Sequence, residues 1–99
     1  MQRGGAVYIM TNKNKTTLYV GVTADLYSRI VQHKEHHFRL SFTARYNLIY
    51  CIYFESFFSI EEAIMREKIL KKWRREKKVQ LINTLNPDWK DLWEEIKEW

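Results

Sequence analysis

Near its start, this 99-residue chain has two short β-prone runs, residues 6–11 and 17–22, separated by the polar run 12–16. This pattern predicts an antiparallel hairpin with a longish loop. Because neighbouring residues of a strand point to opposite faces, one face of the hairpin is expected to bury the same set of apolar side chains: Val7, Ile9, Leu18, Val20 and Val22.

The other face of the predicted hairpin carries two tyrosines and a glycine, Tyr8, Tyr19 and Gly21. A slip of one residue in the register would reverse this assignment. Glycine weakens a strand interior by roughly 0.5 to 1 kcal/mol relative to alanine, so Gly21 needs an explanation. It either leaves an open patch of backbone beside Tyr19 or marks a bulge or a close backbone crossing.

The middle of the chain predicts a helix, a loop and a strand. Thr23 or Asp25 can serve as N-cap for a helix that runs to about residue 37. Residues 36–47 are rich in aromatic and basic side chains but have no sustained period, which indicates a loop. The continuous apolar run 48–55 is typical of a central strand.

Capping signals predict the helices of the second half. Ser59 and Glu62 form a capping box for a helix that ends near residue 74, and a shorter helix is expected over residues 76–85. Asn86 and Pro87 supply an N-cap and a first-turn proline for a last helix near the C-terminus.

The predicted order is therefore β-β-α-β-α-α-α. It corresponds to an α/β fold with a small sheet of about three strands flanked by helices, too short for a doubly wound sheet. The length suits a single domain over residues 1–99.

The charge of the chain indicates an anionic binding partner. The formal net charge is +5, and eight of the thirteen residues 66–78 are basic. A clustered basic face is the footprint expected of binding to a phosphate backbone, although a solvated helix face would look the same. The residues expected to contact nucleic acid are Lys71, Lys72, Arg74, Arg75, Lys77 and Lys78.

Other classes of protein fit the sequence poorly. No apolar run reaches the roughly 18 residues of a membrane span, and the first residues lack the features of a signal peptide, so a cytoplasmic protein without membrane association is expected. The chain has no phosphate-binding glycine motif, and one cysteine cannot provide the spacing of a zinc site. That residue, Cys51, is expected to pack in the core.

Two helical stripes contain polar residues where apolar ones are expected. Arg29 lies about 60° and His33 about 20° from Leu26 around the helix axis, so both fall on the face that should dock on the sheet. Glu67 lies about 40° from Ala63 in the later helix. A lone inward carboxylate is costly unless a cation compensates it. Arg29 and Glu67 could instead form a structural ion pair, or Glu67 could lie at the rim.

These residue types together suit metal-assisted hydrolysis of a phosphodiester. A carboxylate can hold a divalent cation, and a guanidinium matches phosphate oxygens. A phenol or an imidazole can act as general base. The residues leave open which of Tyr8, Tyr19 and His33 would take that role.

The same residues resemble, in order and approximate spacing, the motifs of the GIY-YIG nuclease superfamily, and the chain looks like its small stand-alone bacterial members. The matching elements are Tyr8 in AVY, Tyr19-Val20-Gly21, Arg29 and His33 in RxxxH, and Glu67 in AxxxE. Ala6-Val7-Tyr8 replaces glycine-isoleucine-tyrosine, and Val20 replaces isoleucine. Both changes leave the tyrosines and Gly21 in place.

The resemblance implies a three-stranded antiparallel sheet and cleavage of nucleic acid with one Mg²⁺ or Mn²⁺ ion. Glu67 would hold the metal, Arg29 would contact the scissile phosphate, and Gly21 would leave space for both. Tyr8 and Tyr19 would line the site, with His33 assisting proton transfer. Tyr46 matches a region where family members often have another aromatic residue.

The expected function is that of a metal-dependent endonuclease, acting on DNA in repair or recombination. No additional DNA-recognition domain is expected in these 99 residues, so selectivity would come from the structure of the nucleic acid, from a protein partner or from a surface that the sequence does not reveal. Two alternatives stay open: a nucleic-acid-binding module that does not cut, and a nuclease subunit that is active only with a partner.

Overall fold

The computed structural model describes residues 4–36 and 41–98 and contains one antiparallel sheet. Its strands are β1 (Gly5–Thr11), β2 (Leu18–Thr23) and β3 (Tyr50–Phe57), in the spatial order β2-β1-β3. The three-stranded α/β fold and the N-terminal hairpin expected from the sequence are confirmed.

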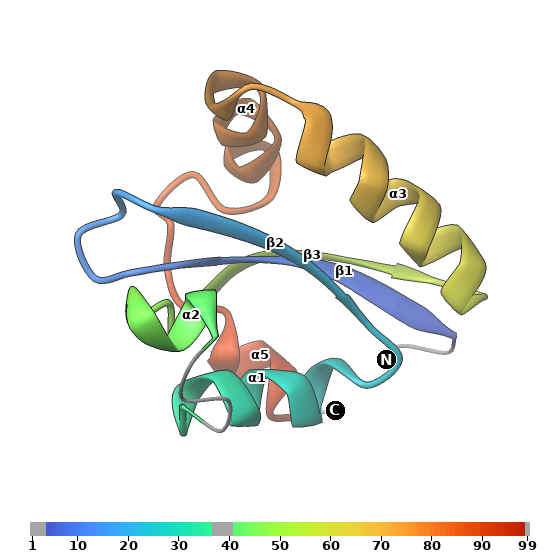
Figure 1. Ribbon diagram of the computed structural model, residues 1–99, viewed down its shortest axis with the longest axis horizontal. Coiled ribbons are helices and arrows are strands. Elements are labelled where there is room, and N and C mark those ends of the chain that lie inside the picture. Colours follow the sequence, from blue (N-terminus) through green and yellow to red (C-terminus); the bar gives the residue numbers. More distant parts are fainter. Residues whose placement is uncertain (1–3, 37–40, 99) are drawn as a thin grey trace.

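Helices cover both faces of this sheet (Figure 1). On one face lie α1 (Leu26–Lys34), α2 (Phe42–Arg45) and α5 (Trp93–Ile96); on the other lie α3 (Ile60–Lys72) and α4 (Arg75–Leu85). Asp25 caps α1 and Ser59 caps α3, because each side chain accepts a hydrogen bond from a backbone N–H of the first turn. No helix among the described residues is long and apolar enough to cross a membrane.

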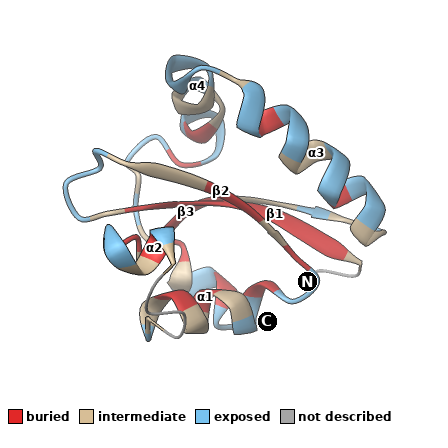
Figure 2. Cartoon of the chain, viewed as in Figure 1, coloured by how far each residue is buried: buried red, intermediate tan, exposed pale blue. Residues whose placement is uncertain are grey.

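The sheet separates two apolar cores, so β1 is buried along its whole length (Figure 2). Tyr8 and Met10 belong to the core under α1 and α5. Val7 and Ile9 belong to the core under α3 and α4, where Val20 and the neighbouring Leu18 and Val22 also pack. The expected division of the hairpin into two faces is confirmed, but both faces are covered.

The expectation that residues 48–55 form the central strand is wrong: β1 is central and β3 lies at the edge. The outer side of β3 resembles an internal position because the chain near the C-terminus hydrogen-bonds to it. Leu92 donates its backbone N–H to the Cys51 carbonyl at 2.7 Å, and Asn86 donates its amide to the Ile52 carbonyl at 3.0 Å. An apolar run is therefore needed at this edge too.

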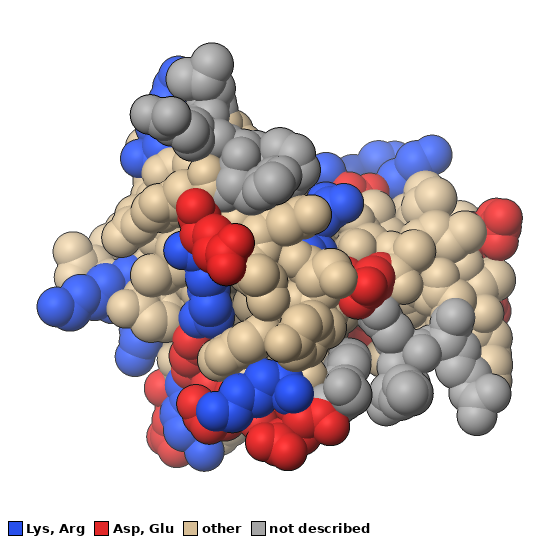
Figure 3. Space-filling view, turned by 90° about the horizontal axis from the view of Figure 1, so that it is seen from below, with Lys and Arg blue, Asp and Glu red and all other residues tan. Residues whose placement is uncertain are grey.

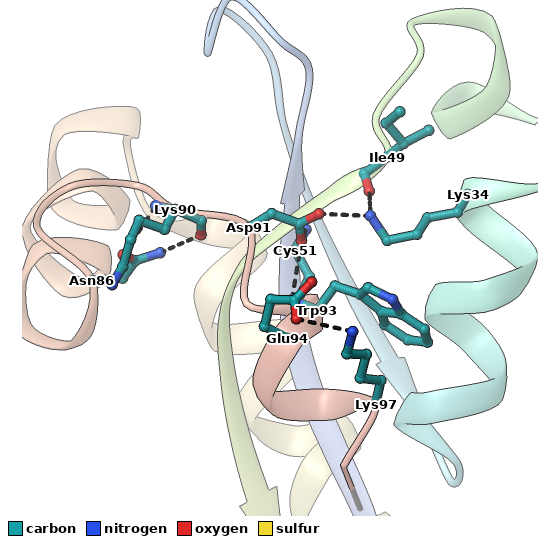
Figure 4. Close-up of polar contacts among 9 residues, drawn as sticks. All are labelled: Lys34, Ile49, Cys51, Asn86, Lys90, Asp91, Trp93, Glu94 and Lys97. Carbon is teal, nitrogen blue, oxygen red and sulfur yellow. Dashed lines mark hydrogen bonds and ion pairs between the residues drawn. The ribbon is translucent and has the colours of Figure 1, made fainter.

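Asp91 ties this C-terminal segment to both β3 and α1 (Figure 4). Its Oδ1 accepts a hydrogen bond from the Cys51 backbone N–H at 3.2 Å, and its Oδ2 lies 2.6 Å from the Lys34 ammonium. Lys34 also donates to the Ile49 carbonyl at 2.9 Å. One carboxylate thus fixes the end of α1 against the edge of the sheet.

Two helix assignments from the sequence are also wrong. The predicted loop 36–47 contains the short helix α2, which Ser41 caps through the backbone N–H of Ala44. Asn86 does not begin the last helix. It is the C-cap of α4, and its buried amide bonds the backbone of Ile52 and Lys90. The final helix, α5, therefore begins only at Trp93.

Candidate active site

Strand pairing places Tyr8 directly opposite Gly21. A Cβ atom at Gly21 would lie 2.4 Å from Cζ and 2.5 Å from the hydroxyl oxygen of Tyr8, which no side chain can tolerate. The space above Gly21 is thus filled by the Tyr8 ring. The expectation of an open clearance for metal and phosphate at Gly21 is wrong, because the glycine is needed to seat the phenol.

The Tyr8 hydroxyl hydrogen-bonds to His33 of α1. Its oxygen is 2.9 Å from His33 Nε2, and His33 Nδ1 is 3.0 Å from Thr43 Oγ1 on α2. Thr43 in turn contacts Ser41 Oγ at 3.1 Å. A chain of polar groups therefore runs from the central strand through α1 to α2, and it satisfies every polar atom of the imidazole.

Burial determines the protonation states of Tyr8 and His33. It raises the pKa of the Tyr8 phenol well above its ordinary value, an effect that the nearby Arg29 guanidinium partly offsets. Burial, assisted by the positive charge of Arg29, lowers the pKa of His33 to about 4. At neutral pH the pair is accordingly an intact phenol beside a neutral imidazole.

Tyr19 is the more accessible of the two tyrosines. It is half-buried, and its ring centroid lies 6.3 Å from that of Tyr8 and 6.0 Å from that of His33. Among the described residues its hydroxyl makes no hydrogen bond, whereas Tyr8 is fully buried. Tyr19 is therefore the phenol that a molecule at the surface can contact.

Arg29 completes this group from α1, four residues before His33 and on the same side of the helix. It is half-buried, and its charge acts on both Tyr8 and His33. The structure thus brings together four of the residues expected at the site: Tyr8, Tyr19, Arg29 and His33.

Glu67 is positioned differently, on α3 and so on the helix layer that covers the opposite face of the sheet. Its side chain is 13% exposed and lies 2.6 Å from the Lys71 ammonium. It shares the inward side of α3 with the buried Ala63 and Leu70, as the periodicity predicts. Among the described residues it forms no ion pair with Arg29, so that structural alternative is wrong.

Several side chains of the predicted nucleic-acid-binding run contact other groups of the protein. Lys71 pairs with Glu67, Arg75 donates to the carbonyls of the β1–β2 loop, and Lys77 lies 4.3 Å from the Trp73 ring centroid. Lys72 and Arg74 are exposed. On the face seen from below, opposite α3, the acidic and basic side chains of the described residues are intermixed at one edge (Figure 3).

Residues of α2 join the site although the sequence pattern predicts a loop there. Thr43 bonds His33, and the Phe42 ring stacks on Tyr19 with a centroid distance of 6.2 Å. The ring centroid of Tyr46 lies 4.8 Å from that of Phe42. The available signal was Ser41, a typical N-cap residue at the start of this segment.

Residues 4–83 match the family model of the GIY-YIG catalytic domain. The chain belongs to the GIY-YIG family. This match spans both tyrosines, Gly21 and the helices α1 and α3, and it indicates a nuclease-type domain. Searches of curated proteins and of solved structures give no match.

The contact between Tyr8 and Gly21 in this GIY-YIG domain predicts that substitutions at the two positions have coupled effects on the free energy of unfolding. Gly21→Ala should lower the free energy of unfolding by about 1 to 3 kcal/mol, because the new methyl overlaps the ring. In a Tyr8→Leu background, which lacks the overlapping ring atoms, the same change should cost at least about 1 kcal/mol less. Urea unfolding of the four proteins measures the coupling.

Tyr8→Phe is the matched control, because it keeps the overlapping ring atoms Cζ and Cε1 and so should keep most of the cost of Gly21→Ala. Additive effects of Gly21→Ala and Tyr8→Leu would contradict the proposed contact.

The lowered pKa of His33 predicts how the stability of the GIY-YIG domain depends on pH. Its pKa is about 4 in the folded protein and about 6.5 in an unfolded chain. The unfolded state therefore binds more protons between these values, and the free energy of unfolding should fall by roughly 2 kcal/mol as pH drops through this window. Urea unfolding at a series of pH values measures this effect. The free energy of unfolding should change less with pH in His33→Gln than in the wild type. Identical pH dependence for the two proteins would refute the assignment.

Proposed function

We propose that this protein is a divalent-metal-dependent endonuclease that hydrolyses phosphodiester bonds of DNA, in repair or recombination. The observation that supports it is the grouping of Tyr8, Tyr19, Arg29 and His33 within a GIY-YIG catalytic domain. A guanidinium, phenols and an imidazole are the groups that bind a phosphate and move a proton from water.

The exposure of each of these residues indicates its role. Tyr8 is fully buried and His33 is 7% exposed, so they act by holding the site in place. The half-buried Tyr19 has a hydroxyl without a partner among the described residues, which suits it to orient or deprotonate the attacking water. The half-buried Arg29 would contact the scissile phosphate and offset its developing negative charge.

Glu67 is the residue that would hold the metal ion. Within the described residues, no group of three or more His, Cys, Asp or Glu side chains could enclose a metal. Mg²⁺, however, keeps most of its water ligands and is often held by one or two carboxylates. A mostly buried carboxylate on the inward side of α3 fits that mode of binding. When bound, the cation would neutralise phosphate charge and lower the pKa of a coordinated water.

The proposal predicts metal-dependent cleavage that requires Glu67 and Arg29. Purified protein should cut at least one member of a panel of duplex, flap, junction and single-stranded DNA and RNA in Mg²⁺ or Mn²⁺, and EDTA should abolish cutting. Glu67→Ala and Arg29→Ala should each lower the rate by about 100-fold or more. Glu61→Ala, which removes an exposed carboxylate from the same helix, should cut like the wild type.

Three outcomes would count against the proposal. Cutting that persists in the Glu67→Ala/Arg29→Ala protein would identify a contaminant. Salt-dependent binding without cutting of any substrate would favour a binding module that does not cut. Activity that appears only in a complex recovered from lysate would favour a subunit that depends on a partner.

The ion pair of Glu67 with Lys71 predicts competition with the metal. A cation at Glu67 would compete with the Lys71 ammonium, which lies 2.6 Å from Oε2 of Glu67 and whose side chain is 50% exposed. Removing this exposed partner with Lys71→Met should therefore tighten Mn²⁺ binding about 2- to 5-fold, measured by isothermal titration. Lys72→Met removes the adjacent exposed charge and should tighten binding less. Unchanged Mn²⁺ affinity in Glu67→Ala would contradict a metal site at Glu67.

A further inference from the structure

Two exposed aromatic side chains lie at the outer end of the ring cluster. Phe42 begins α2 and Tyr46 is its C-cap, and the two ring centroids are 4.8 Å apart. Each residue is 48% exposed, although aromatic residues of this size are highly buried on average. Half of their surface therefore contributes nothing to the core and is free to contact another molecule.

This pair continues the line of rings that begins inside the candidate site. Tyr8 neighbours Tyr19 at 6.3 Å, and Tyr19 stacks on Phe42 at 6.2 Å with an interplanar angle of 28°. Burial decreases in the same order, from the enclosed Tyr8 to the exposed Phe42 and Tyr46. A molecule held at Tyr19 would therefore have the exposed pair directly beside it.

The charge around the pair favours a polyanion. Arg45, the charged residue of α2, is exposed and lies between the two aromatic positions in sequence. No Asp or Glu occurs in residues 41–48, and the charge of Arg29 acts on Tyr8 and His33, whose rings neighbour that of Tyr19. Aromatic rings beside a guanidinium are the combination that holds nucleic-acid bases and phosphates.

We propose that Phe42 and Tyr46 form a stacking site for an unpaired nucleobase beside the scissile phosphate. The position of that phosphate rests on the proposed function. A base inside a duplex is already stacked and paired, so only an unpaired base can offer its face to these rings without an added cost. The substrate class is then nucleic acid with a single-stranded segment next to the cut, such as a flap or a gap.

The test is a binding experiment with a single-stranded oligonucleotide that contains one 2-aminopurine, whose fluorescence is quenched by stacking. Glu67→Ala protein is used in every arm, so that binding is measured without cutting. Adding Phe42→Ala and Tyr46→Ala should remove most of the quenching that the protein causes and weaken binding at least about 5-fold. Phe58→Ala, which removes an aromatic residue that is 82% exposed at another surface, should leave both quantities unchanged.

Leucine at positions 42 and 46 separates stacking from general apolar contact. Phe42→Leu with Tyr46→Leu should also lose quenching, and thermal melting checks that each variant is folded. Full quenching and affinity in either pair of variants would overturn the proposal. An equal loss of affinity for fully paired duplex would overturn it too, because the rings would then not select an unpaired base.

The two proposals can fail separately. If the wild type cuts nucleic acid while the alanine variants bind and quench like their parent, the nuclease function stands and the stacking site is refuted. If quenching depends on Phe42 and Tyr46 but no substrate is cut, the stacking site stands as a nucleic-acid contact and the nuclease function is refuted.

Discussion

The candidate site depends on the contact between the Tyr8 ring and the bare backbone of Gly21. Any side chain at Gly21 would displace this ring, and with it the hydroxyl that bonds His33 at 2.9 Å. His33 in turn bonds Thr43 of α2, so this ring helps to position α1 and α2 on the sheet. The glycine therefore acts through packing first and through chemistry only as a consequence.

The same contact explains why a buried tyrosine is needed on the central strand. A phenylalanine would fill the space above Gly21 equally well, but it would leave the imidazole of His33 without its partner. An unsatisfied buried polar atom costs about 1 to 3 kcal/mol, and the neutral imidazole could then adopt other orientations. The hydroxyl of Tyr8 thus contributes order to the site although it does not reach the surface.

Sequence periodicity predicted much of this arrangement because it depends on local geometry. The two faces of the hairpin follow from a period of two residues, and the inward positions of His33 and Glu67 follow from a period of 3.6. Contacts between distant segments have no such signature. Nothing in the run 48–55 reveals that Asn86 and Leu92 cover its outer edge. The partner of Gly21 was missed for the same reason.

Short segments were the other source of error. The helix α2 has four residues, too few to show a helical period, and its packing on Tyr19 stabilises it instead. Asn86 and Pro87 look like a helix start, but the Asn86 side chain is used to bond the backbone of Ile52 and Lys90. Capping residues identify a place where the chain changes direction, and tertiary contacts decide which element ends or begins there.

The two helix layers contribute different parts of the candidate site. Arg29 comes from the layer under the tyrosines, whereas Glu67 comes from the layer on the other face. A substrate that contacts both must therefore approach where neither layer encloses the sheet, and β2, the outer strand of the β1–β2 hairpin, forms one edge of the sheet. β2 also carries Tyr19, the accessible phenol. The order of the strands thus places Tyr19 at an edge of the sheet and keeps Tyr8, whose hydroxyl bonds His33, on the central strand.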